Sequence, residues 1–375
     1  MTGLSRRALL RRAACGTAAA AWMPLRALAE PNGQEASPDE RKAMAAAAEG
    51  FCRDFNVPGL SVAIARAGRL VYAEGFGLAD QGNPVKPSHL FRIASVSKPI
   101  TSVAVFTLVE QGRLSLSDKV FGANGILQGQ YGPRSRRPFV EDITVEHLLT
   151  HICGGWQNDG NDPMFKNPQM SHQQLIAWTL ENQPLLNPPG AKYAYSNFGY
   201  CVLGRIIEKV SRQSYASYAT SAVLGRCGIT AMRIAGNTRA QRSPNEVAYY
   251  PDGNPYGMNV ARMDSHGGWI ASATDLVRFA MHVDGLAAER SILKADTIKT
   301  MTAPSAANRG YAKGWAVNGR NWWHNGSLPG TTSIMVRTQS GFCWAALANA
   351  RHGESGGALD RLVWTMVRAV GAWKA

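Results

Sequence analysis

The sequence has few cysteines, and none are arranged as metal ligands. Six cysteines occur in 375 residues, no two of them spaced as Cys-x-x-Cys. No cluster of cysteine and histidine has the spacing of zinc ligands, so a zinc-ribbon or thiol-redox protein is excluded. Five cysteines lie beyond the N-terminal segment, and an odd number leaves at least one thiol free. We expect buried thiols and at most a minor role for disulfides.

The sequence also lacks the charge pattern of a nucleic-acid-binding protein. Its net charge is +14, but the basic residues are scattered and are not interleaved with aromatic residues in a stripe. A solvated basic surface is the favoured interpretation, and attraction to anionic cell-wall polymers is an alternative. We predict no nucleic-acid partner. The oligomeric state cannot be read from the sequence.

The apolar stretch nearest the N-terminus, residues 13–23, is too short to span a bilayer. The pair Arg6-Arg7 precedes it, and the A-x-A sequence at 27–29 follows it. This order is typical of a twin-arginine signal peptide, predicted here as residues 1–29. The remaining chain would be exported already folded, be periplasmic or secreted, and have no membrane span. A loose basic tail is the alternative.

Periodicity in the rest of the chain predicts a mixed α/β (α+β) fold. Residues 37–55 read as a capped helix, 60–77 as a hairpin turning near Gly68, and 100–109 as a buried helix. Strand-like runs follow residue 314, and a helix with one apolar face closes the chain. Helical patches separated by loops fill the middle. We predict one catalytic domain over 30–375, with an α/β part at 37–115 and 261–375 and a mostly helical insertion at 116–260.

Two serines precede a lysine at the start of the predicted buried helix. Ser95 lies three residues before Lys98 and therefore on the same helical face, whereas Ser97 points elsewhere. Pro99 lacks an N–H and fits only in the first helical turn, so Ser95 lies at the helix N-terminus. Burial would lower the pKa of Lys98 and let a neutral amine take the Ser95 proton. On this motif alone, a plain helix cap at Ser95 is equally favoured.

Spacing alone is weak evidence, because Ser291 and Lys294 repeat the pattern in a polar segment. Two downstream motifs strengthen the first pair: Tyr-x-Asn at 195–197, in a loop entering a helix, and His-x-Gly at 324–326, between two predicted strands. A second His-x-Gly at 266–268 leads into a capped helix, and we interpret it as a turn. His151 is interpreted as structural. The loop 156–164 is interpreted as solvated, with a place at the pocket rim as the alternative.

The order Ser-x-x-Lys, Tyr-x-Asn, His-x-Gly resembles the serine β-lactamase and penicillin-binding-protein superfamily. Within it, the chain is similar to the branch with class C β-lactamases, D-alanyl-D-alanine carboxypeptidases, D-aminopeptidases and β-lactamase-like esterases. Flanking stretches agree, including "ITVEHLLTHICGG" at 143–155 and "HNGSLPG" at 324–330. The resemblance spans about 58–350. It implies a β-lactamase/transpeptidase-like fold, in which an antiparallel sheet is flanked by helices.

The resemblance also implies roles for individual residues. Ser95 would be the acylated nucleophile, Lys98 its base, and Tyr195 the acid that protonates the leaving group. Asn197 would contact Lys98 or the substrate amide. Gly326 would allow close approach of the substrate, and the N–H groups of Ser95 and Ser327 would form an oxyanion hole. No metal or cofactor is required.

His324 stands where β-lactamases and carboxypeptidases usually carry a lysine that holds the substrate carboxylate. A histidine is mostly neutral at pH 7, so its pull on an anion is weaker. We therefore expect a serine hydrolase of small esters or D-residue amides, with peptidoglycan fragments as one source of substrate. A D-alanyl-D-alanine carboxypeptidase or class C-like β-lactamase is one alternative. A non-catalytic penicillin-binding sensor is another.

Overall fold

The structure is a computed structural model. It describes residues 36–375 except 132–136, 251–252, 288, 372 and 374–375. The predicted signal peptide, residues 1–29, lies outside the described residues. Within the described part of the chain, no helix has the length and apolar character needed to cross a membrane.

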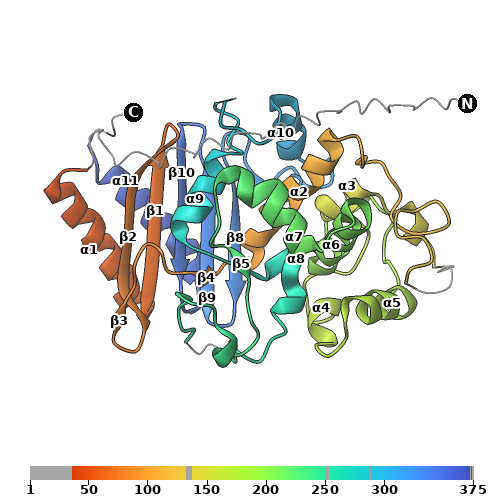
Figure 1. The fold of residues 1–375 in the computed structure, drawn as a ribbon, viewed down its shortest axis with the longest axis horizontal. Helices are drawn as coiled ribbons and strands as arrows, with labels where there is room; N and C mark the ends of the chain where they lie inside the picture. Colours follow the sequence, from red (N-terminus) through yellow and green to blue (C-terminus); the bar gives the residue numbers. More distant parts are fainter. Residues whose placement is uncertain (1–35, 132–136, 251–252, 288, 372, 374–375) are drawn as a thin grey trace, which may run out of the picture. The chain divides into compact units, whose positions relative to one another are not determined.

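Seven strands of the described chain form one antiparallel sheet at the centre of the fold (Figure 1). Their order across the sheet is β3 (Asn83–Pro84), β2 (Arg69–Asp80), β1 (Gly59–Arg66), β10 (Phe342–Ala348), β9 (Thr331–Arg337), β8 (Trp322–Leu328) and β7 (Ala316–Val317). The first and last parts of the chain therefore meet at the β1–β10 pair. A smaller sheet has the order β4 (Phe91–Arg92), β6 (Trp269–Ala271) and β5 (Arg233–Ile234).

The predicted hairpin is present, and its turn explains its geometry. Arg66 pairs with Arg69, so Ala67 and Gly68 form a two-residue loop. Both have positive φ, +47° for Ala67 and +80° for Gly68. This is the pattern of a type I′ turn, whose twist matches that of the flanking strands. Glycine adopts this conformation without steric cost, which explains its place in the turn.

Eleven α-helices appear in the described residues. They are α1 (Pro38–Asp54), α2 (Ser97–Glu110), α3 (Val145–Leu149), α4 (Pro163–Lys166), α5 (His172–Asn182), α6 (Asn197–Ser211), α7 (Tyr215–Ala219), α8 (Asp264–Gly267), α9 (Ala273–Met281), α10 (Ala295–Thr302) and α11 (Ser355–Arg368). The N-terminal helix has the predicted capping box of Ser37 and Glu40. Its start and that of α6, capped by Ser196, follow ordinary capping rules.

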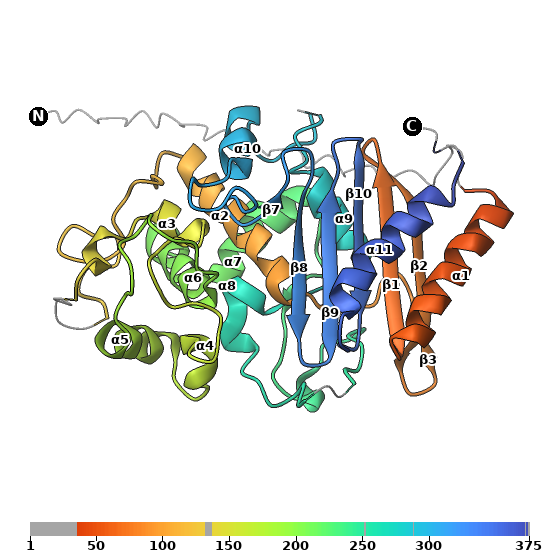
Figure 2. The same cartoon turned by 180° about the vertical axis from the view of Figure 1, so that it is seen from behind.

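Alternation along β1 separates two cores. Leu60, Val62 and Ile64 pack in a cluster with α1 and α11, which lie side by side on one face of the sheet (Figure 2). Ala63 and Ala65 point to the other face, into a larger cluster that includes α2, α6 and α9. The sheet is therefore buried on both faces.

The helices α3 to α7 gather at the end of the molecule away from α1 (Figures 1 and 2). The buried helix α2 runs between this helical part and the sheet, and it contacts α6, α7 and α8. Every residue of α2 from Ser97 to Leu108 is buried. The N-terminus of α2 is thereby held where the helical part meets strand β8, and the candidate site lies there.

Candidate active site

The chain turns sharply just before α2 and leaves Ser95 accessible. Residues 94–96 form a short 3₁₀ turn, η1, that leads directly into α2. Ala94 has a φ of +46°, an uncommon conformation for a non-glycine residue that is often found at functional sites. Ser95 is partly exposed, whereas Ser97 is fully buried and accepts a hydrogen bond from the Trp269 N–H. The structure thus separates the two serines as their spacing predicts.

Lys98 lies beneath Ser95 and is fully buried. Its Nζ lies 3.0 Å from Ser95 Oγ, 2.8 Å from Asn197 Oδ1 and 3.0 Å from the carbonyl oxygen of His266. Burial lowers the pKa of Lys98 to about 7, and the charge of Asp162 opposes this shift. A buried lysine with this pKa is partly neutral near pH 7, as a general base must be.

Tyr195 covers Lys98 from the side of the helical part. Lys98 Nζ lies 4.8 Å from the centre of its ring. Burial raises the pKa of the Tyr195 phenol well above its usual range, and hydrogen bonding to Ser95 partly offsets the increase. Tyr195 therefore carries its proton at neutral pH, so it can act as an acid but not as a free phenolate.

His151 holds the segment that carries Tyr195. It is fully buried, and its Nδ1 accepts the backbone N–H of Ser196 at 3.0 Å. Its ring lies 4.2 Å from the Tyr195 ring, centre to centre. Burial lowers the pKa of His151 well below its usual range, so the ring is neutral. These contacts agree with the structural role predicted for His151.

Both ring nitrogens of His324 are used within the protein. Nδ1 lies 2.7 Å from the Asn325 carbonyl oxygen, and Nε2 lies 3.0 Å from the Tyr311 hydroxyl. Burial and then the charge of Lys98 lower the pKa of His324 to about 3. The ring is neutral at pH 7, so Nδ1–H donates to the carbonyl and Nε2 accepts from Tyr311. His324 therefore supplies no positive charge to the site.

Gly326 brings strand β8 against the turn that carries Ser95. A Cβ at Gly326 would lie 2.2 Å from the Ile93 carbonyl oxygen and 2.2 Å from Ser333 Oγ. Gly326 therefore lets strand β8 pack closely against the turn before Ser95. The predicted close approach of substrate to Gly326 stays a prediction. Ser327 follows with an exposed side chain. Its part in an oxyanion hole also stays a prediction.

The sequence interpretation missed Asp162. It placed the loop 156–164 in solvent, which is right for the exposed residues 157–161 but wrong for both ends, because Trp156 is buried and Asp162 is 1% exposed. Its Oδ2 accepts a hydrogen bond of 2.9 Å from Asn197 Nδ2. Burial raises the pKa of Asp162 to about 6. The Asp162-Pro163 pair resembles a helix start, and that was the only local signal for its position.

Two further contacts were also missed. The capped helix predicted after residues 266–268 is present as α9, but their interpretation as a turn is wrong: His266 lies in α8, strand β6 comes before α9, and the His266 carbonyl oxygen contacts Lys98. Tyr311, which forms a hydrogen bond with His324, is part of no motif in the sequence.

The second Ser-x-x-Lys pair lacks the helical geometry of the first. Ser291 and Lys294 are not helical, and Ser291 Oγ donates a hydrogen bond to the Leu293 carbonyl oxygen.

The five cysteines of the described residues are all free, and within the same residues no three His, Cys, Asp or Glu side chains are grouped to hold a metal ion.

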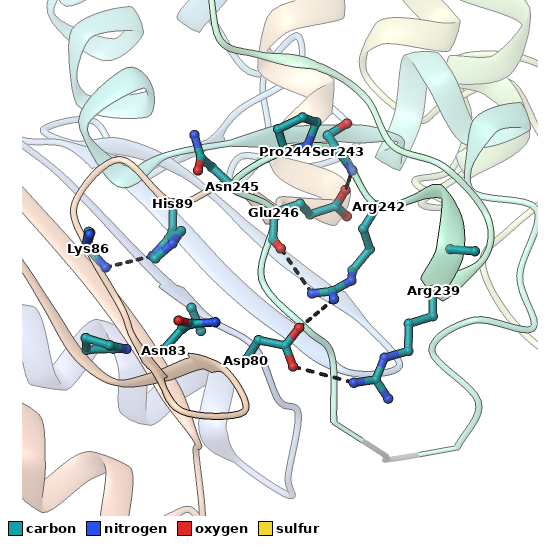
Figure 3. A pocket seen from close by; sticks show the side chains of 13 residues that line it. Asp80, Asn83, Lys86, His89, Arg239, Arg242, Ser243, Pro244, Asn245 and Glu246 are labelled. Atoms are coloured by element: carbon teal, nitrogen blue, oxygen red, sulfur yellow. Dashed lines mark hydrogen bonds and ion pairs between the residues drawn. The ribbon is translucent and has the colours of Figure 1, made fainter.

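A separate polar cavity of about 720 Å³ lies between the end of β2 and the loop 239–246 (Figure 3). Arg242 and Arg239 both pair with Asp80 at its wall. None of the site residues named above lines it.

A family model described as Beta-lactamase matches residues 40–365. The chain belongs to the beta-lactamase family. The resemblance drawn from the three motifs is therefore confirmed, as is the predicted fold.

Several relatives of this beta-lactamase family chain are informative. It is 28% identical to penicillin-binding protein 4* of Bacillus subtilis over 311 residues, which cover 74% of this chain and 64% of that protein. It is 24% identical to protein flp of Staphylococcus aureus, with 78% and 60% covered. The chain thus spans less than two thirds of the length of these relatives.

Solved structures show the same fold. SurE in complex with D-Leu is 26% identical, with a TM-score of 0.68 and 90% of this chain and 78% of that chain covered. D-amino acid amidase of Ochrobactrum anthropi SV3, complexed with D-phenylalanine, is 20% identical, with a TM-score of 0.72 and 89% and 100% covered. Class C beta-lactamase of Rhodobacter sphaeroides is 21% identical, with a TM-score of 0.69 and 88% and 100% covered. The last two likenesses support the fold alone.

Proposed function

We propose that the protein is a serine hydrolase that uses Ser95, Lys98 and Tyr195 to hydrolyse small carboxylic esters or D-residue amides through an acyl-enzyme. The observation that carries the proposal is the environment of Lys98. The Lys98 amine is fully buried, and its pKa is lowered to about 7. Its nitrogen lies 3.0 Å from the hydroxyl oxygen of Ser95, which is partly exposed. Burying an amine has a large desolvation cost, so its burial beside a partly exposed serine favours a functional role.

The proposed reaction has two halves. Ser95 Oγ attacks the substrate carbonyl carbon while its proton passes to the neutral Lys98 amine, and a tetrahedral oxyanion forms. That intermediate collapses, the bond to the leaving group breaks, and Tyr195 protonates the leaving group while it takes up the proton that Lys98 gained from Ser95, so that Lys98 is neutral again. Water then attacks the acyl-enzyme and gives a proton to the Tyr195/Lys98 pair. The second tetrahedral intermediate collapses, the acid is released, and the Ser95 oxygen takes the proton back from this pair.

The state of His324 supports a neutral substrate. The ring carries no charge, and its two nitrogens are occupied by Tyr311 and Asn325. A carboxylate-bearing substrate would find no cation at this position. The D-residue part of the proposal draws on SurE, which is 26% identical to this chain and whose structure holds D-Leu. For the location, the twin-arginine pattern at residues 1–29 supports export to the periplasm or beyond.

A substrate comparison tests this proposal. Neutral p-nitrophenyl butyrate should be hydrolysed with a kcat/KM roughly 10 to 100 times that of an ester of equal length ending in a carboxylate, since a hydrogen bond to a charged group contributes about 1.5–3 kcal/mol. Nitrocefin should be a poor substrate. His324→Lys should bring the kcat/KM values of the two esters closer together. Faster turnover of nitrocefin than of the neutral ester would instead favour a β-lactamase.

The pH dependence tests the role of Lys98. The folded protein holds the pKa of Lys98 at about 7, below its usual value, so the base is protonated and inactive on the acid side. We expect kcat/KM to rise with pH through an apparent pKa of about 7 and to level off above it. The measurement is kcat/KM for p-nitrophenyl butyrate in buffers of constant ionic strength. A rise centred near the ordinary carboxylate pKa of about 4 would contradict Lys98 as the base.

A further inference from the structure

Asp162 is a buried carboxylate that none of the proposed chemical steps uses. It ends the loop after Trp156 and caps the short helix α4, where its Oδ1 accepts the Met164 N–H at 2.9 Å. Its other oxygen, Oδ2, accepts from Asn197 Nδ2 at 2.9 Å. The residue is 1% exposed. Withdrawing a carboxylate from water in this way costs free energy, so a compensating role is expected.

The carboxylate determines which way the Asn197 amide points. An ionised carboxylate only accepts hydrogen bonds, so the Asn197 group facing Asp162 must be the NH₂. The amide oxygen then faces the other way, and Asn197 Oδ1 lies 2.8 Å from Lys98 Nζ. The orientation therefore follows from hydrogen-bonding chemistry, not from the similar shapes of oxygen and nitrogen.

This orientation directs the lone pair of Lys98. A neutral amine has two protons and one lone pair. Two of its three neighbours, Asn197 Oδ1 and the His266 carbonyl oxygen, can only accept a hydrogen bond from an amine proton. The lone pair is left for the third neighbour, Ser95 Oγ, at 3.0 Å. An amide turned the other way would donate its NH₂ to the lone pair and compete with the Ser95 hydroxyl.

We propose that Asp162 is a positioning residue that fixes the amide of Asn197, so that neutral Lys98 directs its lone pair to the Ser95 hydroxyl. The inference rests on the proposed function, because it assigns Lys98 as the base. Asp162 touches neither Ser95 nor a substrate in this account; it acts through Asn197. Its carboxylate also favours the charged form of Lys98, while burial disfavours that form.

Other charged or titratable groups share this region. The exposed Asp159 of the same loop raises the pKa of Asp162, and Lys98 lowers it. Three histidines near Lys98 have pKa values that are lowered first by burial and then by the charge of Lys98: His151, His266 and His324. The Tyr195 ring also lies beside Lys98. All three histidines are neutral, and the charge of Asp162 favours the protonated form of Lys98.

The test is Asp162→Asn in the full chain, with Asp159→Asn as the matched control. Asparagine still caps α4 but no longer dictates the Asn197 orientation. We expect kcat for p-nitrophenyl butyrate to fall roughly 10- to 100-fold with KM within about twofold. The acid limb of kcat/KM should move to lower pH, because a negative charge near Lys98 is lost. Asp159→Asn should change neither.

A double-mutant cycle tests whether Asp162 acts through Asn197. Adding Asp162→Asn to Asn197→Ala should cost less than about twofold in kcat. Full additivity of the two losses would overturn the inference, and so would a wild-type kcat and acid limb in Asp162→Asn. If wild type itself shows no ester hydrolysis that depends on Ser95, the proposed function fails instead, and the two failures are distinguishable.

A measurement on the wild-type protein covers the case of a poorly folded variant. With ¹⁵N-asparagine labelling, the Asn197 side-chain NH₂ signals, assigned by their loss in Asn197→Ala, should show slow exchange with solvent at pH 8. They should shift as the pH falls through about 6, where Asp162 takes up a proton. Rapid exchange and no shift across this range would overturn the inference.

Discussion

Ser95→Ala should lower hydrolysis of p-nitrophenyl butyrate by roughly 1,000-fold or more, because no other group replaces a lost nucleophile. Ser97→Ala should leave kcat/KM within about threefold of wild type. Ser97 is fully buried and makes one long hydrogen bond, 3.4 Å, from the Trp269 N–H. Its loss affects stability by about 1 kcal/mol, without touching the reacting atoms.

The two variants form a matched pair, because they remove the same atom two residues apart. Both should be checked for unchanged thermal unfolding within a few degrees. Equal loss of activity in both would contradict the assignment of the nucleophile. Retained activity in Ser95→Ala, with loss in Ser97→Ala, would place the nucleophile at the buried position and contradict the described geometry.

Lys98→Met is expected to lower kcat/KM by roughly 1,000-fold, because general-base catalysis and correct orientation of the nucleophile are lost together. Methionine is similar in length and tolerates burial. Lys98→Arg should fail as well, although it keeps a positive charge, because a guanidinium does not give up its proton near pH 7. The measurement is kcat/KM at pH 8, with the protein concentration set by absorbance.

The second Ser-x-x-Lys pair offers the control. Lys294 has the same spacing from Ser291 as Lys98 has from Ser95, but it lies at the exposed start of α10. Lys294→Met should leave kcat/KM unchanged. Substantial activity in Lys98→Arg would show that positive charge, not proton transfer, is what the site requires, and Lys98 would then not be the base.

Local patterns predicted the elements whose residues are close in sequence. The capping box at Ser37, the glycine turn at Gly68 and the apolar face of α11 each depend on residues within about four positions. The separation of Ser95 from Ser97 was predictable for the same reason, since helical geometry and Pro99 act over one turn. The three motifs in order were enough to indicate the family.

The parts of the site that were missed depend on contacts between distant segments. Asn197 meets Asp162 across 35 residues, and Lys98 meets the His266 carbonyl across 168. A backbone carbonyl has no sequence signal, and an aspartate in a polar loop looks like any solvated aspartate. Tyr311 reaches His324 only because the β7–β8 turn places them together. Periodicity and spacing carry no information on such pairs.

The most direct test of the account is to find the acyl group. Wild-type protein is quenched in acid while it turns over p-nitrophenyl butyrate. Its intact mass is then measured by mass spectrometry, and the modified residue is located by peptide mapping. We predict one butyryl group, on Ser95, that is lost on longer incubation before the quench as substrate runs out, and no adduct in Ser95→Ala. A butyryl group on another residue, or turnover with no adduct under conditions that trap half of the enzyme in a control serine esterase, would contradict the proposed mechanism. An adduct on Ser95 that never hydrolyses would contradict it too, and would identify a binding module in place of an enzyme.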